Sequence, residues 1–235
     1  MTKLIVFLKY PTPGDVKSRL GTNTSMTFSS SIYKKFTTDV LNTITSNNID
    51  AVIYAKKNES LNAYEKWLNT SLEINFQCDG NLGEKLIHSF KKEFENGHSK
   101  VIVIGTDSPQ ISGTLIKKAS DSLETNDTVI GPAFDGGYYL IGINKNAFFD
   151  NIFKDINWST ESVFNETKTK ILSQNKTIHI LPKLSDIDTL KDLKNLISDQ
   201  KNKHSPISNT DTISPIHTLN FLKEDPRFTH LFDDK

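Results

Sequence analysis

Residues 129–143 read VIGPAFDGGYYLIGI, two runs of strand-forming residues on either side of an Asp-Gly-Gly turn. Valine, isoleucine and tyrosine favour strands, and both runs are apolar enough to be buried. The second run follows the first through a short turn, so we expect it to lie antiparallel in a mixed sheet. Two interpretations of the turn are open. Asp135, Gly136 and Gly137 let a ligand approach the backbone because glycine has no Cβ, or they form a plain hairpin, since Asp-Gly is a strong turn signal.

Outward from this stretch, apolar runs of strand length alternate with segments of helical period. Repeated β-α-β units of this kind predict a mostly parallel sheet with helices on both faces, an α/β fold. The other predicted strands are residues 4–8, 51–55, 72–76, 101–105 and 177–181. The predicted helices are residues 26–45, 61–68, 82–94, 112–123, 146–153, 161–173 (capped by the Trp-Ser-Thr at 158–160) and 188–198.

The composition bounds the class of protein. Lysine plus arginine and aspartate plus glutamate balance at 28 each in 235 residues, so no overall charge attracts nucleic acid or an anionic membrane. The first apolar run ends at Lys9 and is too short for a signal peptide or a membrane span. Cys78 is the single cysteine, which excludes an internal disulfide and fits a reducing compartment. We therefore expect a cytoplasmic protein without nucleic-acid or membrane partners.

The chain changes character near residue 200. Residues 1–199 carry the alternating strands and helices and are predicted to form one domain. Residues 200–215 are polar and interrupted by prolines, which predicts a linker. Residues 216–235 hold too few apolar side chains to fold alone, so we expect this tail to dock on the domain or on a partner.

Ligands of open α/β sheets bind beyond the carboxyl ends of the strands, and polar segments follow several of the predicted strands. The first of these segments has three cations and two prolines within a short loop. Cations and backbone N–H groups on such a loop can bind phosphate oxygens. The alternative is a solvated basic loop. The candidate phosphate-binding residues are Lys9, Pro13, Gly14, Lys17 and Arg19.

Three carboxylates at strand ends are candidates for a metal site. Asp107 directly follows the most apolar strand, and Asp186 and Asp188 follow the last one. Carboxylate oxygens suit Mg²⁺ or Mn²⁺, ions that bridge substrate phosphates, so Asp107 with Asp186 or Asp188 is predicted to hold one of them. Thr106 and Ser108 are candidate ligand-binding neighbours. The alternative is that Asp107 and Asp188 only cap the helices that follow them.

A smaller polar segment after the third strand contains Gly80 and Gly83. It is a candidate contact for a base or a sugar, and the turn that starts the next helix is the alternative. The six histidines have no metal-ligand spacing, and the chain has no motif of a serine-type triad. The chemistry predicted for this chain therefore rests on carboxylates and cations.

Five motifs occur in order along residues 3–198: Lys9-x-Pro-x-Pro-Gly-x-x-Lys17-x-Arg19-Leu20, Gly105-Thr-Asp107-Ser-Pro109, Gly131-Pro-Ala-x-Asp135-Gly-Gly-Tyr-Tyr-Leu-Ile-Gly142, Trp158-Ser-Thr160 and Asp186-x-Asp188-Thr189. Together they resemble the CofC-like, glycosyltransferase-A-type transferases of bacteria, the DUF2064 family. Some members of that family are arsenosugar-pathway glycosyltransferases, and its relatives include nucleotidyltransferases of deazaflavin and molybdenum cofactor synthesis.

This resemblance implies a GT-A nucleotide-diphosphosugar transferase fold, a three-layer α/β/α sandwich with a mostly parallel, mixed sheet. It also implies a nucleotide or nucleotide-sugar ligand with Mg²⁺ or Mn²⁺. By analogy, Lys17 and Arg19 hold the phosphates, Asp107 holds the metal and Asp188 is a second metal ligand. The first loop is not the Gly-rich form of nucleotidyltransferases, and Thr-Asp107-Ser is not the Asp-x-Asp of many glycosyltransferases, which leaves the donor type open.

Three functions are therefore open. The first is a metal-dependent glycosyltransferase that uses a nucleotide-sugar and a small-molecule acceptor. The second is a nucleotidyltransferase that joins an NTP to a small phosphorylated acid or sugar and releases pyrophosphate, and the third is a non-catalytic nucleotide-binding scaffold. In either enzyme Lys17 and Arg19 would neutralise charge on the leaving group, and Asp107 with Asp186 or Asp188 would hold the metal against the diphosphate. Asp135, with the backbone of Gly136 and Gly137, would hold the acceptor or the sugar, and Asp135 could also take a proton from the acceptor. A homodimer is the assembly we consider.

Overall fold

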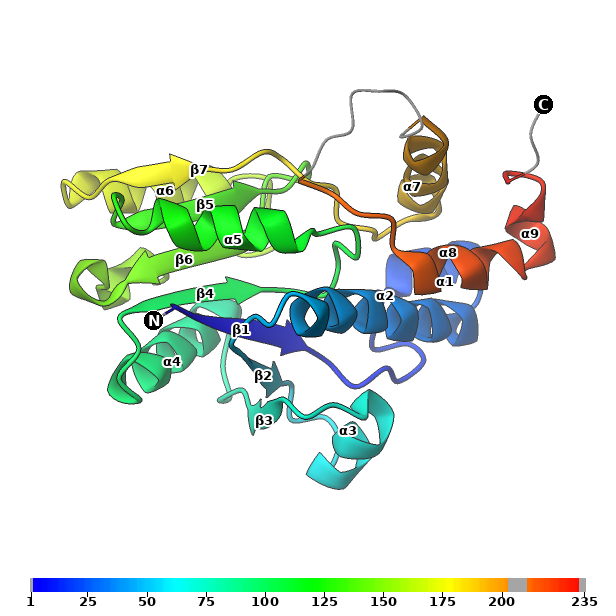
Figure 1. Ribbon diagram of the computed structural model, residues 1–235, viewed down its shortest axis with the longest axis horizontal. Helices are drawn as coiled ribbons and strands as arrows, with labels where there is room; N and C mark the ends of the chain where they lie inside the picture. The colour runs from blue at the N-terminus through cyan, green and yellow to red at the C-terminus, as the bar shows by residue number, and fades with distance from the viewer. Residues whose placement is uncertain (1, 203–210, 233–235) are drawn as a thin grey trace. The chain divides into compact units, whose positions relative to one another are not determined.

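The strand-forming runs assemble into one sheet in the computed structural model of the chain (Figure 1). The structure describes residues 2–202 and 211–232. Contacts within the chain divide it into two units. The first unit consists of Met1–Tyr10, Asn48–Gly105 and Ile116–Leu184. The second unit consists of Pro11–Asn47, Thr106–Leu115 and Ser185–Lys235.

Within the described residues, the first unit is built on a seven-stranded mixed sheet. The strands lie in the order β3-β2-β1-β4-β6-β5-β7 (Figure 1). Every neighbouring pair is parallel except the two pairs that β6 makes with β4 and β5, so the predicted mixed sheet is confirmed. The strands are β1 (Thr2–Leu8), β2 (Ala51–Ala55), β3 (Glu73–Phe76), β4 (Lys100–Ile104), β5 (Thr128–Pro132), β6 (Tyr138–Asn144) and β7 (Ile178–Ile180).

Helices lie on both faces of this sheet, as expected for an α/β sandwich. On one face Phe90 and Ile171 join a buried cluster with alternate side chains of the strands. On the other face Leu123 lies against Gly142 of β6. The predicted fold class is therefore confirmed. The helices with residues in this unit are α3 (Leu61–Leu68), α4 (Leu82–Glu95), α5 (Gly113–Ser122) and α6 (Val163–Ser173), and its 3-10 turns are η1 (Lys145–Ala147) and η2 (Asp150–Ile152).

The helix predicted over residues 146–153 is wrong, because the structure has η1 and η2 there instead. Phe148 and Phe149 between them have extended backbone angles (φ −72°, ψ 134° and φ −148°, ψ 141°). Phe148 packs its ring 5.7 Å from the ring of Phe90 and 5.4 Å from that of Phe94. Aromatic packing has thus overridden the local helical pattern.

The start of α6 also differs from its prediction. The helix begins at Val163, and Ser162 at its N-cap makes no capping hydrogen bond. Thr160, the expected cap, instead donates a hydrogen bond to Asn157 O at 2.6 Å. The Trp-Ser-Thr motif therefore shapes the loop before α6 and does not cap the helix.

The turn between β5 and β6 is held by the chain's own backbone. Asp135 Oδ1 accepts a hydrogen bond from Gly137 N at 2.9 Å, which closes an Asx-type turn. Gly136 has a φ of +90°, and its carbonyl accepts a hydrogen bond from Phe164 N at 2.9 Å. A Cβ on Gly136 would lie 2.5 Å from Glu161 Cα. The segment before α6 thus makes the close approach to the backbone that Gly136 permits. A ligand at Asp135 stays a prediction.

The second unit is organised around α2 (Met26–Ser46), which Ser25 caps by accepting a hydrogen bond from Phe28 N at 3.1 Å. The C-terminal tail packs on this helix. The ring of Phe28 lies 5.5 Å from the rings of Phe221 and Phe228. The other helices of this unit are α1 (Ser18–Asn23), α7 (Leu190–Asn202), α8 (Ile216–Lys223) and α9 (Pro226–Thr229).

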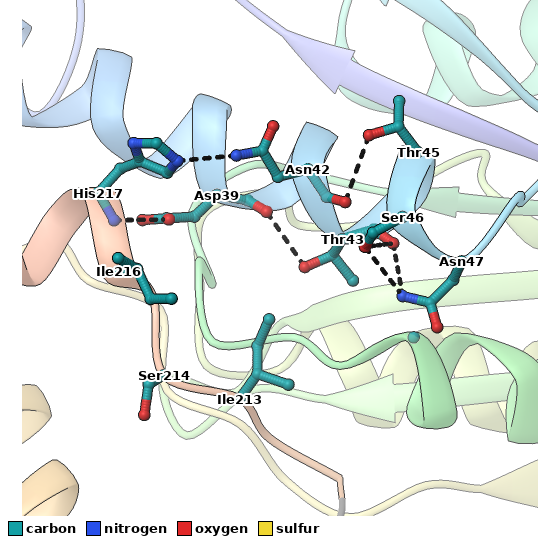
Figure 2. A pocket seen from close by; sticks show the side chains of 11 residues that line it. Asp39, Asn42, Thr43, Thr45, Ser46, Asn47, Ile213, Ser214, Ile216 and His217 are labelled. Atoms are coloured by element: carbon teal, nitrogen blue, oxygen red, sulfur yellow. Dashed lines mark hydrogen bonds between the residues drawn. The ribbon is translucent and has the colours of Figure 1, made fainter.

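A buried carboxylate anchors the start of α8 to α2 (Figure 2). Asp39 accepts hydrogen bonds from His217 N (2.9 Å), Thr218 N (2.9 Å) and Thr218 Oγ1 (2.6 Å). Burial raises the pKa of Asp39, and these hydrogen bonds oppose the rise because they favour the ionised form. Two amides at a helix start and one carboxylate form an N-terminal cap supplied by another helix.

Of the predictions for the C-terminal part of the chain, the structure bears on the tail but not on the whole linker. Residues 216–232 of the tail contact α2 within the second unit. The predicted linker at 200–215 falls in part on residues 203–210, which lie outside the described residues. The boundary at residue 199 stays a prediction. None of the helices in the described part of the chain combines the length and apolar character that a membrane span needs.

A cavity of about 640 Å³ lies between the end of α2 and the segment that leads into α8 (Figure 2). Amides, hydroxyls and isoleucines dominate its lining. The carboxylate of Asp39 is there too, but three donors already engage it. The cavity therefore offers neither cations for phosphate nor a carboxylate pair for a metal. Its principal lining residues are Asn42, Ser46, Asn47, Ile213, Ile216 and His217.

Docking of the tail on α2 is expected to stabilise the second unit. Leu222 of α8 is fully buried (0% exposed), so Leu222→Ala should lower the free energy of unfolding by about 2–5 kcal/mol. Ile216 on the same helix is 62% exposed, and Ile216→Ala should change it by less than about 0.5 kcal/mol. Urea unfolding followed by circular dichroism measures both. Equal losses for the two variants would contradict this docking.

The two turn glycines should respond differently to alanine. Gly136→Ala forces a left-handed backbone on a residue with a Cβ and a clash with Glu161, so we expect a loss of about 1–3 kcal/mol in unfolding free energy. At Gly137 an added Cβ meets only the Asp135 carboxylate, at 3.2 Å, and Gly137→Ala is the matched control with a loss below about 1 kcal/mol. Thermal or urea unfolding decides between them, and a tolerant Gly136 would refute the account of the turn.

Candidate functional site

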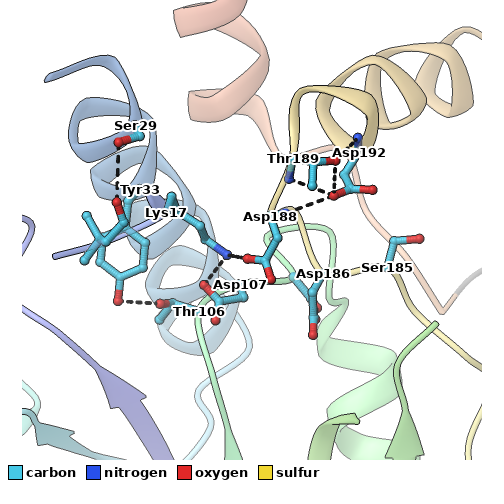
Figure 3. Close-up of polar contacts among 12 residues, drawn as sticks. Lys17, Ser29, Tyr33, Thr106, Asp107, Ser185, Asp186, Asp188, Thr189 and Asp192 are labelled. Carbon is cyan, nitrogen blue, oxygen red and sulfur yellow. Dashed lines mark hydrogen bonds and ion pairs between the residues drawn. The ribbon is translucent and has the colours of Figure 1, made fainter. Parts of the chain in front are cut away.

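One buried ammonium lies between two carboxylates in the second unit (Figure 3). Lys17 Nζ is 2.5 Å from Asp107 Oδ1 and 2.6 Å from Asp188 Oδ1. The lysine side chain is 4% exposed, whereas those of Asp107 and Asp188 are 49% and 43% exposed. We call these three residues the Lys17 triad. Three segments that are distant in sequence thus meet at the ammonium of Lys17. Both carboxylates remain partly open to solvent.

The electrostatics of the triad favour a charged lysine. Burial by itself would lower the pKa of Lys17, but the charges of Asp107 and Asp188 and their hydrogen bonds raise it well above its usual value. The ring of Phe36 adds a further favourable contact, since Nζ lies 5.8 Å from its centroid. The triad therefore carries a net charge of about −1 at neutral pH, one ammonium against two carboxylates.

The loop that bears Lys17 is pinned to α2. Ser30 Oγ donates a hydrogen bond to Pro11 O at 2.7 Å, and Ser29 Oγ donates one to Val16 O at 3.4 Å. Lys17 itself has a φ of +50° and precedes α1. This left-handed backbone redirects the chain into the helix and is sparsely populated by residues other than glycine. The hydrogen bonds from α2 thus fix the backbone of the loop, and the two carboxylates fix the side chain of Lys17.

The segments that bear Asp107 and Asp188 are fastened to each other. Ser108 Oγ donates a hydrogen bond to Asp186 Oδ1 at 2.5 Å, and Ile187 N donates one to Asp107 O at 2.9 Å. Gln110 Nε2 also donates a hydrogen bond, at 2.7 Å, to the carbonyl of the residue before Asp186. Of the three predicted metal ligands, Asp186 is therefore engaged by a serine, whereas the other two share the ammonium of Lys17.

The alternative that Asp188 caps α7 is wrong. Thr189 performs that role, since its Oγ1 accepts a hydrogen bond from Asp192 N at 3.3 Å. Asp192 Oδ2 in return accepts hydrogen bonds from Thr189 N (2.8 Å) and Asp188 N (3.2 Å) (Figure 3). This reciprocal arrangement satisfies the amides of the helix start. The Asp188 side chain is then available to Lys17.

Thr106 and Ser108 flank Asp107 but face the interior. Thr106 Oγ1 donates a hydrogen bond to Tyr33 Oη of α2 at 3.0 Å, and both Thr106 and Ser108 are buried (Figure 3). From the sequence, both were proposed as ligand contacts. In the structure, the hydrogen bonds of Thr106 to Tyr33 and of Ser108 to Asp186 fix the segment that bears Asp107. Tyr33 and Ser30 were missed altogether. No signal in the sequence marks them, because both positions lie outside the apolar residues of this helix that are spaced four apart, Ile32, Phe36, Val40 and Ile44.

The other predicted site residues of this loop, Pro13, Gly14 and Arg19, are open to solvent. Pro13 and Gly14 form a turn in which Asp15 N donates a hydrogen bond to Thr12 O at 3.1 Å. Gly14 has a φ of +93°. Arg19 lies in the first turn of α1 and is exposed, as are the two turn residues. The loop thus presents one buried and one exposed cation.

The other predicted site residues belong to the first unit. Lys9 is exposed directly after β1, and Asp135 is exposed at the β5–β6 turn. Gly80 has a φ of +109° and leads into a capping box between Asn81 and Glu84 that starts α4. Gly80 thus belongs to the turn that starts α4, and a ligand contact at this segment stays a prediction.

Gly83 lies in the first turn of α4, directly against another segment of the first unit. A Cβ there would contact the carbonyl of Phe153 and lie 3.1 Å from Trp158 Nε1. Trp158, part of the fourth motif, thus packs on the helix start that the glycine makes accessible. This contact explains why a residue without a side chain stands at position 83.

The donor set of the triad fits a divalent cation. No group of three His, Cys, Asp or Glu side chains that could hold a metal occurs among residues 2–202 and 211–232. Mg²⁺, however, is commonly held by one or two carboxylates, with substrate phosphates and water completing its shell. Asp107 and Asp188 provide two such carboxylates that already share a cation and remain half open to solvent. These two residues could hold Mg²⁺ or Mn²⁺.

Comparisons with known proteins agree with this fold. A solved protein from Desulfovibrio desulfuricans G20, provisionally named a nucleotide-diphospho-sugar transferase, is 30% identical, with a TM-score of 0.86 over 100% of this chain and 99% of that one. The inositol-1-phosphate CTP transferase of T. maritima is 12% identical, with a TM-score of 0.54 over 88% of this chain and 97% of that one. The 4-diphosphocytidyl-2C-methyl-D-erythritol synthase of Anaerococcus prevotii DSM 20548 is 11% identical, with a TM-score of 0.55 over 82% and 94%.

The two more distant structures support the fold alone. No curated protein matches the chain. A family model does match, over residues 40–160, and its description is an uncharacterized protein conserved in bacteria, DUF2064. The match spans β4 with its Asp107 segment and the whole β5–β6 hairpin. The chain belongs to the DUF2064 family.

Proposed function

We propose that the protein is a transferase that acts on a nucleotide bearing a diphosphate, with a nucleotide-sugar as donor and Mg²⁺ or Mn²⁺ as cofactor. The observation that carries this proposal is the Lys17 triad, in which two half-exposed carboxylates and a cation converge. The relative that is 30% identical over the whole chain, and is named a nucleotide-diphospho-sugar transferase, supports the same class. The single cysteine supports a cytoplasmic location.

In this proposal the chain's own residues bind and neutralise the diphosphate. Asp107 and Asp188 would hold the metal, which when bound neutralises phosphate charge as a Lewis acid. Lys17 and the exposed Arg19 would donate hydrogen bonds to phosphate oxygens as charge builds on the leaving group. No side-chain nucleophile is needed, because positioning and charge stabilisation supply the rate enhancement.

Asp135 is our candidate for the acceptor side. Its Oδ1 accepts the Gly137 amide, which orients the carboxyl group, and the side chain is exposed. A carboxylate fixed in this way can accept a hydrogen bond, and then the proton, from an acceptor hydroxyl. The acceptor in this proposal is a small molecule.

A nucleotidyltransferase is the second candidate. The names of the distant relatives of the same fold, a CTP transferase and a diphosphocytidyl synthase, favour it. The same triad would then meet the triphosphate of an NTP, and pyrophosphate would leave instead of a nucleoside diphosphate. A scaffold without activity remains the third possibility considered from the sequence, and it predicts ligand binding without turnover.

Metal-dependent ligand binding tests the site itself. Thermal melts against a panel of nucleotide-sugars and NTPs, with and without Mn²⁺, should show a true ligand stabilising the protein by about 2.7 kcal/mol at a hundred times its Kd, or roughly 5–10 °C. Asp107→Asn should abolish the Mn²⁺-dependent part of this shift. Asp121→Asn, which removes an exposed carboxylate paired with Lys117, is the matched control and should keep it. An Asp107→Asn protein with an unchanged Mn²⁺-dependent shift would refute the metal assignment.

Product analysis separates the two enzymes. With a nucleotide-sugar that stabilises the protein, a glycosyltransferase releases nucleoside diphosphate, and hydrolysis in the absence of acceptor gives the same product. With an NTP and a phosphorylated acceptor, a nucleotidyltransferase releases pyrophosphate. We expect nucleoside diphosphate, measured by ion-exchange chromatography, and a rate at least a hundredfold lower in Asp107→Asn. Pyrophosphate as the product would favour the second candidate, and no turnover of any bound ligand would favour the scaffold.

A further inference from the structure

The two carboxylates that would hold a metal, Asp107 and Asp188, are already paired with a cation of the chain itself. Lys17 Nζ lies 2.5 Å and 2.6 Å from one oxygen of each carboxylate. A divalent ion held by the two residues would have to compete with the ammonium for their carboxylates. The two cations disfavour each other at this pair, because they share the same two counter-charges and repel one another.

We propose that Lys17 is a built-in placeholder cation that excludes divalent metal from the Asp107–Asp188 pair until a diphosphate draws the lysine away. This inference rests on the proposed function, since it assigns an order of events to the same site. Free metal binds poorly in this scheme, and the metal enters together with the diphosphate. Metal and diphosphate therefore bind with positive coupling, each raising the affinity for the other.

Charge explains why the placeholder is effective. With Lys17 in place the pair presents about one net negative charge, and without it two, so removal of the ammonium strengthens the attraction for a divalent ion. The lysine is also well held, because its side chain is 4% exposed and lies over the ring of Phe36. A metal ion arriving alone would have to displace this interaction and leave a buried ammonium without its partners, which is unfavourable.

A diphosphate removes that obstacle. Asp107 and Asp188 are about half exposed, so a ligand reaches them from solvent while Lys17 approaches from the protein side. Phosphate oxygens accept charge-assisted hydrogen bonds from an ammonium on a flexible stem. Lys17 can then exchange its carboxylate partners for phosphate oxygens with little movement of its backbone, and both carboxylates become available to the metal that the phosphates also bind.

The test measures Mn²⁺ binding by equilibrium dialysis, without any turnover. For the full chain with Mn²⁺ alone, we expect Lys17→Met to bind at least tenfold more tightly than the wild type. Adding methylenediphosphonate, a diphosphate that cannot be hydrolysed, should raise the Mn²⁺ affinity of the wild type at least tenfold and that of Lys17→Met less than threefold. Lys91→Met, which breaks an exposed ion pair with Asp150, is the matched control and should behave as the wild type.

A second readout guards against misfolding. Loss of Lys17 leaves two carboxylates facing each other, so Mn²⁺ should raise the Tm of Lys17→Met more than that of the wild type. Circular dichroism checks that the variant folds. If Lys17→Met does not fold, Lys17→Gln decides the question, because it keeps hydrogen-bond donors for both carboxylates without the charge.

The failure of this inference can be told apart from the failure of the proposed function. Equal Mn²⁺ affinities in wild type and Lys17→Met, lost in Asp107→Asn, would overturn the placeholder and leave the metal site standing. No Mn²⁺ binding by any folded variant, with or without methylenediphosphonate, would overturn the metal site and the placeholder together. Tighter binding in Lys17→Met that persists in Asp107→Asn would also overturn the placeholder, because the ion would lie elsewhere.

Discussion

The second unit depends on the requirement that a buried ammonium be paired. A lysine side chain that is 4% exposed would be strongly destabilising without counter-charges, and Asp107 and Asp188 supply them. These carboxylates come from segments about 80 residues apart, and Lys17 from a third segment. Hydrogen bonds that do not involve the lysine also fix each segment, so the surrounding structure, which we call the frame of the triad, already positions the three charges. The triad is therefore a consequence of the surrounding structure as well as a constraint on it.

That frame is largely one helix, α2. Successive turns of the helix contact the loop of Lys17 through Ser30, the start of the Asp107 segment through Tyr33, the ammonium itself through Phe36 and the C-terminal tail through Asp39. With 3.6 residues per turn, each step of three residues turns by about 60° around the axis, so these four contacts spiral around the helix and one element reaches several neighbours. The polar groups of Ser30, Tyr33 and Asp39 on this helix are therefore structural contacts.

The sequence predicted most of the fold but only part of the site. Buried strands can be recognised in a sequence as apolar runs, so the mixed sheet was predictable. Polar residues directly after the strands also indicated correctly that Asp107 and Asp188 would be neighbours. The ammonium between them was not predictable, because which loop residue turns inward depends on the left-handed backbone at Lys17. For Gly136 the sequence left two interpretations open for a similar reason, since composition does not reveal whether a ligand or the chain itself approaches a glycine.

The chain uses one carboxylate from each of two segments instead of an Asp-x-Asp pair, and the burial of the neighbouring residues explains why. Thr106 and Ser108 are buried and engage Tyr33 and Asp186, whereas the side chain of Asp107 between them is 49% exposed. In the partner segment Ile187 is buried, so Asp186 and Asp188 flank it, and Ser108 engages the first of them. Each segment therefore contributes one carboxylate to Lys17. The tertiary structure brings the carboxylates of Asp107 and Asp188 together with one ammonium, that of Lys17, between them. A ligand that offers this ammonium better hydrogen-bond acceptors can separate it from the two carboxylates.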